Sequence, residues 1–267
     1  NGALALNLPG TNLSGLSATI PSVGGLAGLP EGIYDISVVG TDSNATAGTP
    51  GVMQLYLDKT GPSVAGVTVS TSPNNGTVAV SPYTPAVRVT ATFADPLSAG
   101  VRSPIDWAEL TIDGTGAAVP FVPAAGKFTG VTEIGYADIP LTTVAAMTEG
   151  VHILHIRARD AAGNWGPVST TSQLVVDRTG PNVGVITLTQ IVGIRRVRIN
   201  TVATDPAVPG GAPGNVARAE WFLGSDPGVG RGFPMTGVFG APSVAVTANT
   251  GTLPNNQTLT ISVRAQD

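Results

Sequence analysis

The sequence predicts an all-β chain built from tandem β-sandwiches, and three observations carry this prediction. The chain repeats itself, because Asp58-Lys59-Thr60-Gly61-Pro62 returns 119 residues later as Asp177-Arg178-Thr179-Gly180-Pro181. Stretches such as residues 86–93 alternate apolar and polar side chains, which is the period of a strand with one buried face. Charged residues make up only 11% of the chain, against roughly 25% in an average globular protein, while Gly, Pro, Thr and Val are abundant.

The length of the repeat predicts the domain organisation. A period of 119 residues fits one sandwich module, so the 267 residues hold two and a half modules. We expect residues 1–61 to be the C-terminal part of a sandwich behind a Gly-, Leu- and Ser-rich lead-in, residues 62–180 a complete sandwich, and residues 181–267 a sandwich without its last strand. The incomplete ends indicate a window on a longer array. Alternatively, a strand from another molecule completes the open edge and gives a head-to-tail polymer.

Alternation and turn residues predict the elements of the complete module. The expected strands are Val64–Ser70, Ala86–Phe93, Trp107–Ile112, Phe128–Val131, Ala137–Leu141, Val151–Ala158 and Gln173–Val176, with a helical turn at Leu141–Thr148. The last module follows the same plan, since Ala219-Glu220-Trp221 corresponds to Ala108-Glu109-Leu110. Trp107 and Trp221 are expected to anchor the sandwich cores.

Composition excludes several classes of function. The net charge of −4 contains no block of either sign, so we expect neither nucleic-acid binding nor a polybasic membrane patch. No stretch approaches the roughly 20 apolar residues of a membrane helix, so no membrane insertion is expected within this segment. Cysteine is absent, which excludes disulfides and thiolate metal ligands.

Two segments carry a resemblance to a known kind of module. They are His155–Gly166 and Ala219–Gly228. The hallmark is a strand, an Asp, a Gly-Asn turn, a second strand and then a Pro-led junction. With this pattern, residues 31–267 resemble the tandem immunoglobulin-like or fibronectin-type-III-like modules of large bacterial secreted and cell-surface proteins. The antibody-type cysteine pair is missing.

The resemblance implies an elongated array outside the cell with a structural or adhesive role, such as a stalk, a spacer or a filament-forming segment. Its implied partners are neighbouring repeats of the same or identical chains, and cell-surface glycans. The alternative is a non-catalytic spacer or polysaccharide-binding region of a large secreted enzyme. Tandem sandwiches with open ends also suggest self-association.

Catalysis within the chain is not expected. The two histidines, His152 and His155, are three residues apart on one predicted strand and point to opposite faces. No cysteine and no activated-serine motif accompanies them. Residues 228–232 are rich in glycine but lack the Lys-Ser/Thr of a phosphate-binding loop, so they predict a turn. Lys59 and Lys127 are the only lysines, which excludes an isopeptide crosslink in every repeat.

Acidic residues near the junctions are candidates for calcium binding. The candidate ligands are Asp42, Asp58, Asp160 and Asp177, taken as Asp42 with Asp58 and Asp160 with Asp177. Calcium needs roughly six to eight oxygens, which two carboxylates at a junction do not supply alone. A turn is therefore the favoured interpretation of Asp160, together with Gly163 and Asn164. No other cofactor is expected.

Trp165 is the candidate for ligand binding. It lies in the predicted loop after Asp160 and Asn164, where an indole ring is expected to be exposed. Exposed aromatic rings stack on sugars in carbohydrate-binding modules. The three tryptophans occupy three different places in the repeats and so predict no shared aromatic platform.

Overall fold

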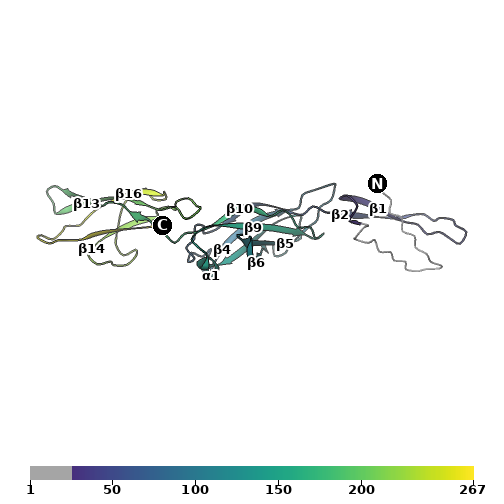
Figure 1. The fold of residues 1–267 in the computed structure, drawn as a ribbon, viewed down its shortest axis with the longest axis horizontal. Coiled ribbons are helices and arrows are strands. Elements are labelled where there is room, and N and C mark those ends of the chain that lie inside the picture. Colours follow the sequence, from purple (N-terminus) through teal and green to yellow (C-terminus); the bar gives the residue numbers. More distant parts are fainter. Residues whose placement is uncertain (1–25) are drawn as a thin grey trace. The chain divides into compact units, whose positions relative to one another are not determined.

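A computed structural model describes residues 26–267 and shows an all-β fold, with one short helix among these residues (Figure 1). The first strand pair is the antiparallel hairpin of β1 (Gly32–Val38) and β2 (Gly51–Leu57). The predicted lead-in lies almost entirely outside the described residues. The helical turn expected at 141–148 is confirmed as α1 (Leu141–Ala146).

The next strands form two four-stranded sheets with the orders β3-β4-β8-β7 and β10-β9-β5-β6. Their bounds are β3 (Ser63–Val69), β4 (Ala86–Ala94), β5 (Ile105–Ile112), β6 (Thr115–Pro120), β7 (Val122–Pro123), β8 (Thr132–Pro140), β9 (Gly150–Asp160) and β10 (Ser169–Val176). Alternate residues of β4, β8 and β9 are buried, as the period of two predicts. Phe93 is fully buried, and its ring meets Phe121 and Phe128 edge-on at centroid distances of 5.0 and 6.1 Å.

The last part of the chain repeats this plan in one sheet with the order β11-β13-β12, in which β16 also pairs with β13, and a second with the order β15-β14-β17. The bounds are β11 (Asn182–Val183), β12 (Thr187–Ile191), β13 (Arg196–Thr204), β14 (Arg218–Leu223), β15 (Phe233–Pro234), β16 (Ser243–Asn249) and β17 (Ile261–Gln266). Both sheets contribute to one core, in which Ile199 and Val246 pack with Trp221 and Ala265. This arrangement is the expected β-sandwich.

Two expectations about the strands are wrong. Phe128–Val131 is a loop rather than a strand, because the Glu133 carboxylate accepts hydrogen bonds from the N–H groups of Thr129 and Gly130, at 3.0 and 2.6 Å. Trp107 is not a core residue, since 42% of it is exposed. The register of β5 shifts between Ile105 and Trp107, and the alternation then turns Ala108 and Leu110 inward.

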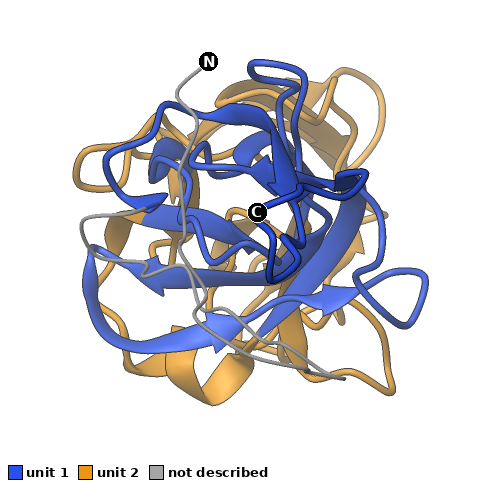
Figure 2. Ribbon diagram, turned by 90° about the vertical axis from the view of Figure 1, so that its right-hand side faces the viewer, with its two compact units in different colours: residues 1–68, 89–138, 154–172 blue, residues 69–88, 139–153, 173–267 orange. Residues whose placement is uncertain are grey.

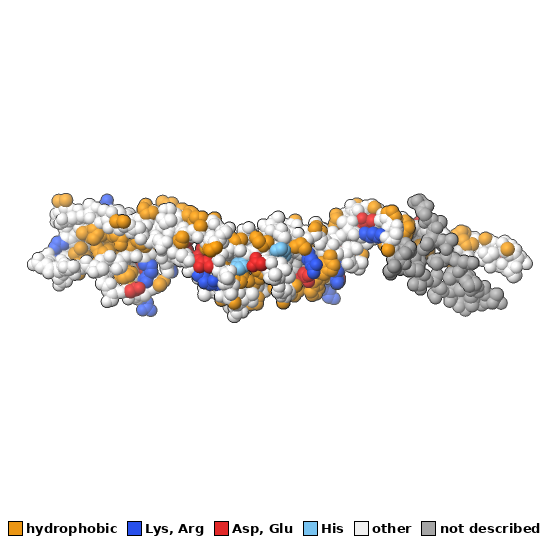
Figure 3. All heavy atoms as spheres, in the orientation of Figure 1, with side chains coloured by type: hydrophobic (Ala, Val, Ile, Leu, Met, Phe, Trp, Pro, Cys, Tyr) orange, Lys and Arg blue, Asp and Glu red, His pale blue; other side chains and the backbone are white. Residues whose placement is uncertain are grey.

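Contacts along the chain divide it into two compact units, coloured in Figure 2. One contains residues 1–68, 89–138 and 154–172, and the other contains residues 69–88, 139–153 and 173–267. The module limits predicted near residues 61 and 180, and the elongated array, stay predictions. Charged side chains appear as a few separate groups on the face in Figure 3. Among residues 26–267, no helix has the length and apolar character needed to span a membrane.

Candidate metal centre

Two clusters of three aspartates repeat in the structure. In each cluster, one carboxylate oxygen from every member lies within 4.8 Å of those of the other two. The first acidic cluster is Asp58, Asp95 and Asp160, and the second acidic cluster is Asp177, Asp205 and Asp267. All members of the first cluster belong to one compact unit, and all members of the second belong to the other.

The repeat of the sequence builds both clusters from the same three places. One aspartate opens the Thr-Gly-Pro junction, at Asp58 and 119 residues later at Asp177. A second follows β4 or β13 and precedes a proline, at positions 95 and 205, which are 110 residues apart. The third lies at the end of β9 or just after β17, at positions 160 and 267, which are 107 residues apart.

Hydrogen-bond donors surround the first acidic cluster. The backbone N–H of Ser103 donates to Asp95 Oδ2 at 2.6 Å, and the hydroxyl of Ser103 donates to Asp58 Oδ2. Asn164 donates to Asp160 from its backbone at 2.8 Å and from its side chain at 3.0 Å. Asp95 Oδ1 is buried without a hydrogen-bond partner among the described residues. Hydrogen bonds from the protein therefore stabilise most of the negative charge of this cluster.

The second acidic cluster has far fewer donors. The N–H of Thr179 donates to Asp177 Oδ1 at 3.1 Å. Asp205 is only 1% exposed, and within the described part of the chain no hydrogen bond reaches either of its carboxylate oxygens. Gly214 lies directly against this cluster, and a Cβ atom there would approach Asp205 Oδ2 to 2.3 Å and Asp177 Oδ2 to 3.1 Å.

Burial disfavours the charged form of several of these carboxylates. Burial, assisted by the charges of Asp177 and Asp267, raises the pKa of Asp205 to about 6. Burial also raises the pKa of Asp58, Asp95 and Asp177. Both clusters therefore hold acidic groups with a raised affinity for a proton.

A repeated joint lies beside the first cluster. Glu31 accepts hydrogen bonds from the Lys59 N–H at 3.2 Å, from the Thr60 hydroxyl at 2.8 Å and from the Ser98 hydroxyl at 2.8 Å. The bonds from Ser98 and Thr60 lower the pKa of Glu31 to about 2. The Lys59 ammonium group donates to the carbonyls of Ala27 and Leu29, at 2.8 and 2.5 Å. Its amine therefore binds the backbone.

The same joint recurs beside the second cluster. The Arg178 N–H donates to Glu149 Oε1 at 3.3 Å, and hydrogen bonding from Thr179 lowers the pKa of Glu149. The Arg178 guanidinium group donates to the carbonyls of Val144 and Ala145, both at 3.0 Å. The N–H of Val151 donates to the Pro209 carbonyl at 3.2 Å. A Glu, a basic residue and a Thr thus perform the same tasks in both repeats.

The first joint also contains a close approach of two backbones. A Cβ atom at Gly166 would lie 1.6 Å from the Pro62 carbonyl oxygen, and one at Gly61 would lie 2.4 Å from the Gly166 nitrogen. Only glycine leaves room for such an approach. The neighbouring Trp165 ring is 39% exposed, and the guanidinium carbon of Arg157 lies 4.2 Å from its centroid. A cation–π contact therefore covers part of the ring proposed for ligand binding.

The structure places the predicted calcium candidates in three different surroundings. Asp58 and Asp160 share the first acidic cluster, whereas Asp177 belongs to the second. Asp42 lies in a turn, where its Oδ1 accepts hydrogen bonds from the N–H groups of Asn44 and Thr46, at 2.9 and 2.8 Å. The turn expected at Asp160 is confirmed, with Gly163 at a φ of 94° and its N–H donating to the Asp160 carbonyl at 3.1 Å.

Sequence reasoning missed Asp95 and Asp205 as site residues. An Asp followed by Pro is a frequent start of a turn, and this local interpretation explains both positions without a site. The useful signal was their repetition at a spacing of 110, close to that of the junction aspartates. Repeated acids at three places in one module indicate a shared cluster more strongly than any single Asp does.

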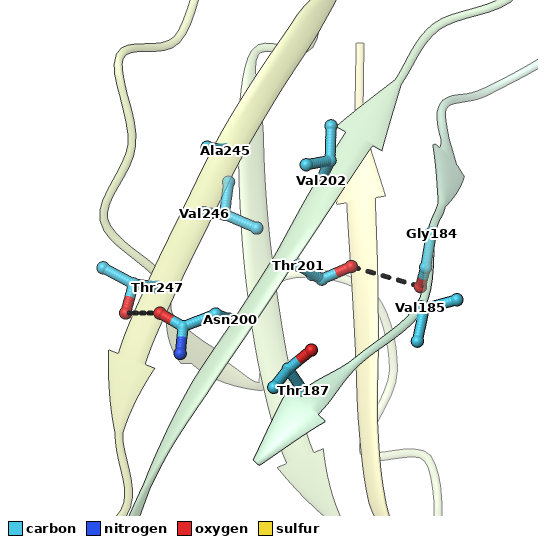
Figure 4. A pocket seen from close by; sticks show the side chains of 9 residues that line it. All are labelled: Gly184, Val185, Thr187, Asn200, Thr201, Val202, Ala245, Val246 and Thr247. Carbon is cyan, nitrogen blue, oxygen red and sulfur yellow. Dashed lines mark hydrogen bonds between the residues drawn. The ribbon is translucent and has the colours of Figure 1, made fainter. Parts of the chain in front are cut away.

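Two hollows on the described surface offer little chemistry. A groove of about 620 Å³ lies over β13 and β16 (Figure 4). Its polar groups bind one another, because Thr247 donates to Asn200 at 2.9 Å and Thr201 donates to the Gly184 carbonyl at 3.1 Å. A second hollow of about 270 Å³ contains His155 beside Arg157 and Glu109. Glu109 already forms an ion pair with Arg157 at 2.6 Å.

The glycine-rich segment 228–232 cradles a carboxylate of the protein itself. The N–H groups of Gly230 and Gly232 donate to the two oxygens of Glu220, at 3.0 and 2.8 Å. Arg264 forms ion pairs with Glu220 at 2.7 Å and with Asp226 at 2.9 Å. This loop therefore serves the structure of its own module.

Comparisons with known proteins do not identify the chain. No protein family matches the sequence, and no curated protein matches it. Among solved structures, the chain is similar to the FN1–FN3 domains of chicken CNTN1, with 14% identity over 87% of this chain and 72% of that one. The TM-score of this pair is 0.27. The assignment to antiparallel β-sandwiches therefore comes from the sheets and cores described above.

Proposed function

We propose that the chain is a non-catalytic, structural or adhesive repeat region of a bacterial surface protein, located outside the cell. The observation that carries the proposal is the repeated joint, in which Glu31, Lys59 and Thr60 have the counterparts Glu149, Arg178 and Thr179. Catalysis requires a single active site, whereas an elongated spacer requires a similar connection between each pair of neighbouring modules. The repetition of the joint therefore supports a stalk or filament.

The loop packing at the joints supports the same role. Glu31 binds Ser98 of the following module, and a Cβ atom at Gly100 would lie 3.7 Å from Ile33. At the second joint the matching loop presents Gly210, whose Cβ would lie 3.9 Å from Val151. In each case a loop glycine with positive φ packs against the residue after the Glu-Gly pair. Such contacts resist bending at the joint.

The proposal is tested first by location. An antibody raised against residues 62–180 is expected to label intact, unpermeabilised cells of the source organism. Labelling that requires permeabilisation would overturn the extracellular assignment. Self-association is tested separately by analytical ultracentrifugation over a wide concentration range. Concentration-dependent growth of the mass supports a filament-forming segment, and a monodisperse monomer at high concentration leaves only the stalk or spacer.

The role of the joint is tested by small-angle scattering. Glu149→Gln removes the negative charge to which Arg178 and Thr179 donate hydrogen bonds. Because this weakens the joint, we expect the variant to broaden the distribution of interatomic distances. Glu133→Gln is the matched control, because Glu133 accepts hydrogen bonds from the loop residues Thr129 and Gly130 and from no residue of the joint described above. Equal scattering from the wild type and the Glu149→Gln variant would refute a stiffening role of the joint.

A further inference from the structure

The two acidic clusters differ at one position that faces their carboxylates. Ser103 lies two residues before Ile105, whose N–H donates to the Gly130 carbonyl at 2.9 Å. Gly214 lies two residues before Val216, whose N–H donates to the Ala241 carbonyl at 3.0 Å. The two positions are therefore equivalent. The first cluster has a serine that donates two hydrogen bonds, and the second has a glycine without a side chain.

The second cluster consequently concentrates negative charge that the described residues do not neutralise. Asp205 is 1% exposed, and both of its oxygens lack a hydrogen-bond donor among residues 26–267. A buried carboxylate without a partner is strongly destabilising, and two neighbouring carboxylates add repulsion. The unfavourable free energy of burying the Asp205 carboxylate without a partner points to a ligand that supplies positive charge.

We propose that the second acidic cluster, Asp177, Asp205 and Asp267, binds one hard divalent cation of the calcium class through its carboxylate oxygens. Ca²⁺–oxygen distances are about 2.4 Å, so two ligand atoms of one ion lie at most about 4.8 Å apart. Oxygens from all three aspartates meet this limit. The space beside Asp205 and Asp177 exists because Gly214 has no Cβ atom.

The ligand chemistry favours Ca²⁺ over the other common ions. All three side chains offer oxygen, which hard cations prefer, whereas zinc prefers nitrogen and sulfur ligands. Three carboxylates carry six oxygens and a formal charge of −3, and water or backbone carbonyls complete a shell of roughly six to eight. Mg²⁺ demands a smaller and stricter octahedral shell and gives up its water reluctantly, so it is expected to bind more weakly.

A proton is the competitor of the cation at this cluster. Burial raises the pKa of Asp205 to about 6, so the carboxylate is mostly ionised at pH 7.5. The titratable groups next to it are Asp177 and Asp267, and Glu149 acts on Asp177. Binding is therefore tested at pH 7.5.

The first cluster is the internal comparison. Five of its six carboxylate oxygens accept hydrogen bonds from Thr60, Ser103 or Asn164, and only Asp95 Oδ1 does not. A cation there would compete with these donors, and the Ser103 hydroxyl occupies the place that Gly214 leaves open. The ion therefore belongs to the second cluster, independently of where the protein is located.

The test is Ca²⁺ binding to the EDTA-treated 267-residue chain at pH 7.5, measured by equilibrium dialysis and by isothermal titration calorimetry. We expect one Ca²⁺ per chain, with Mg²⁺ binding at least tenfold more weakly. Asp205→Asn keeps the size of the side chain and is expected to weaken Ca²⁺ binding at least tenfold. Gly214→Ala is expected to do the same by filling the cradle.

Two controls locate the site. Asp35→Asn changes an exposed acid on β1, and Asp95→Asn changes the first cluster, so both variants are expected to bind Ca²⁺ like the wild type. Circular dichroism establishes that each variant is folded, and a rise in the melting temperature of the wild type on adding Ca²⁺ needs no variant at all. Absence of binding at about 1 mM Ca²⁺, the weak end for extracellular modules, would overturn the proposal. Unchanged binding in a folded Asp205→Asn variant, or loss of binding in Asp95→Asn, would overturn it too.

Discussion

Replacing Asp205 by asparagine is expected to change how the stability of the last module depends on pH. In the folded chain the pKa of Asp205 rises from 3.8 to about 6, mainly because the carboxyl group is buried. The folded state therefore holds this proton to a higher pH than the unfolded state does. Its stabilising contribution is complete below pH 3.8, is lost as the pH rises towards about 6, and stays lost above that.

The size of the effect follows from the same values. A tenfold change in proton affinity corresponds to about 1.4 kcal/mol, so a rise from 3.8 to about 6 gives a loss of about 3 kcal/mol between pH 4 and pH 7 in the absence of divalent cations. The amide of the Asp205→Asn variant carries no charge at any of these pH values. Relative to the wild type, this variant is therefore expected to gain about 3 kcal/mol of unfolding free energy over this range.

The assay is urea unfolding in EDTA at intervals from pH 4 to pH 7, followed by tryptophan fluorescence. Trp221 is 4% exposed and lies in the core of the same sandwich, so it reports on this module. Trp107 and Trp165 are replaced by phenylalanine in both proteins, which leaves Trp221 as the only tryptophan. If the pH profiles of the two proteins run parallel, the burial and repulsion assigned to Asp205 are refuted.

Three further outcomes are expected. Gly166→Ala should lower the unfolding free energy by about 3 kcal/mol, the upper end for overpacking, because the added Cβ would lie 1.6 Å from the Pro62 carbonyl oxygen. Urea unfolding measures this loss, and the control Gly40→Ala should change the unfolding free energy little, because no atom lies within 4 Å of a Cβ there. Ser103→Gly should remove the hydroxyl that donates to Asp58 Oδ2 and open space beside the first acidic cluster, so that dialysis at high Ca²⁺ detects a second, weaker site per chain; an unchanged stoichiometry would contradict the role given to the serine. Removing Ca²⁺ with EDTA should destabilise the wild type by about 1.4 kcal/mol relative to a free Ca²⁺ concentration about ten times the dissociation constant, seen as a lower melting temperature.

Most of the strands could be predicted because their pattern is local. β4, after its first residue, and β9 alternate buried residues with mostly half-buried ones, which a period of two reveals. β6 could not be found in this way, since Thr115–Pro120 is exposed at nearly every position and has no buried face. Its strand conformation is set by pairing with β5, which is a non-local property. Phe128 is the opposite case, because an apolar residue in a loop packs on the core without any strand.

The candidate site was only half visible in the sequence for a related reason. Asp58 and Asp160 could be selected as candidates because each lies near a junction in the sequence. They are 102 residues apart, however, and only the fold brings their carboxylates together. Asp205 gives no local sign of its burial, since Asp-Pro is typical of an exposed turn. What makes it unusual is the absence of a side chain at Gly214, nine residues further on.

The bond between Glu31 and Ser98 has a consequence for any experiment on a single module. A fragment that begins at Pro62 lacks Glu31, which accepts a hydrogen bond from the Ser98 hydroxyl. It also lacks Asp58, which accepts a hydrogen bond from the Ser103 hydroxyl. The loop with Ser98 and Ser103 would therefore keep its donors and lose both acceptors. The thermodynamic unit of this chain is therefore a module together with the tail of its predecessor, and stabilities measured on excised modules would underestimate the stability in the intact protein.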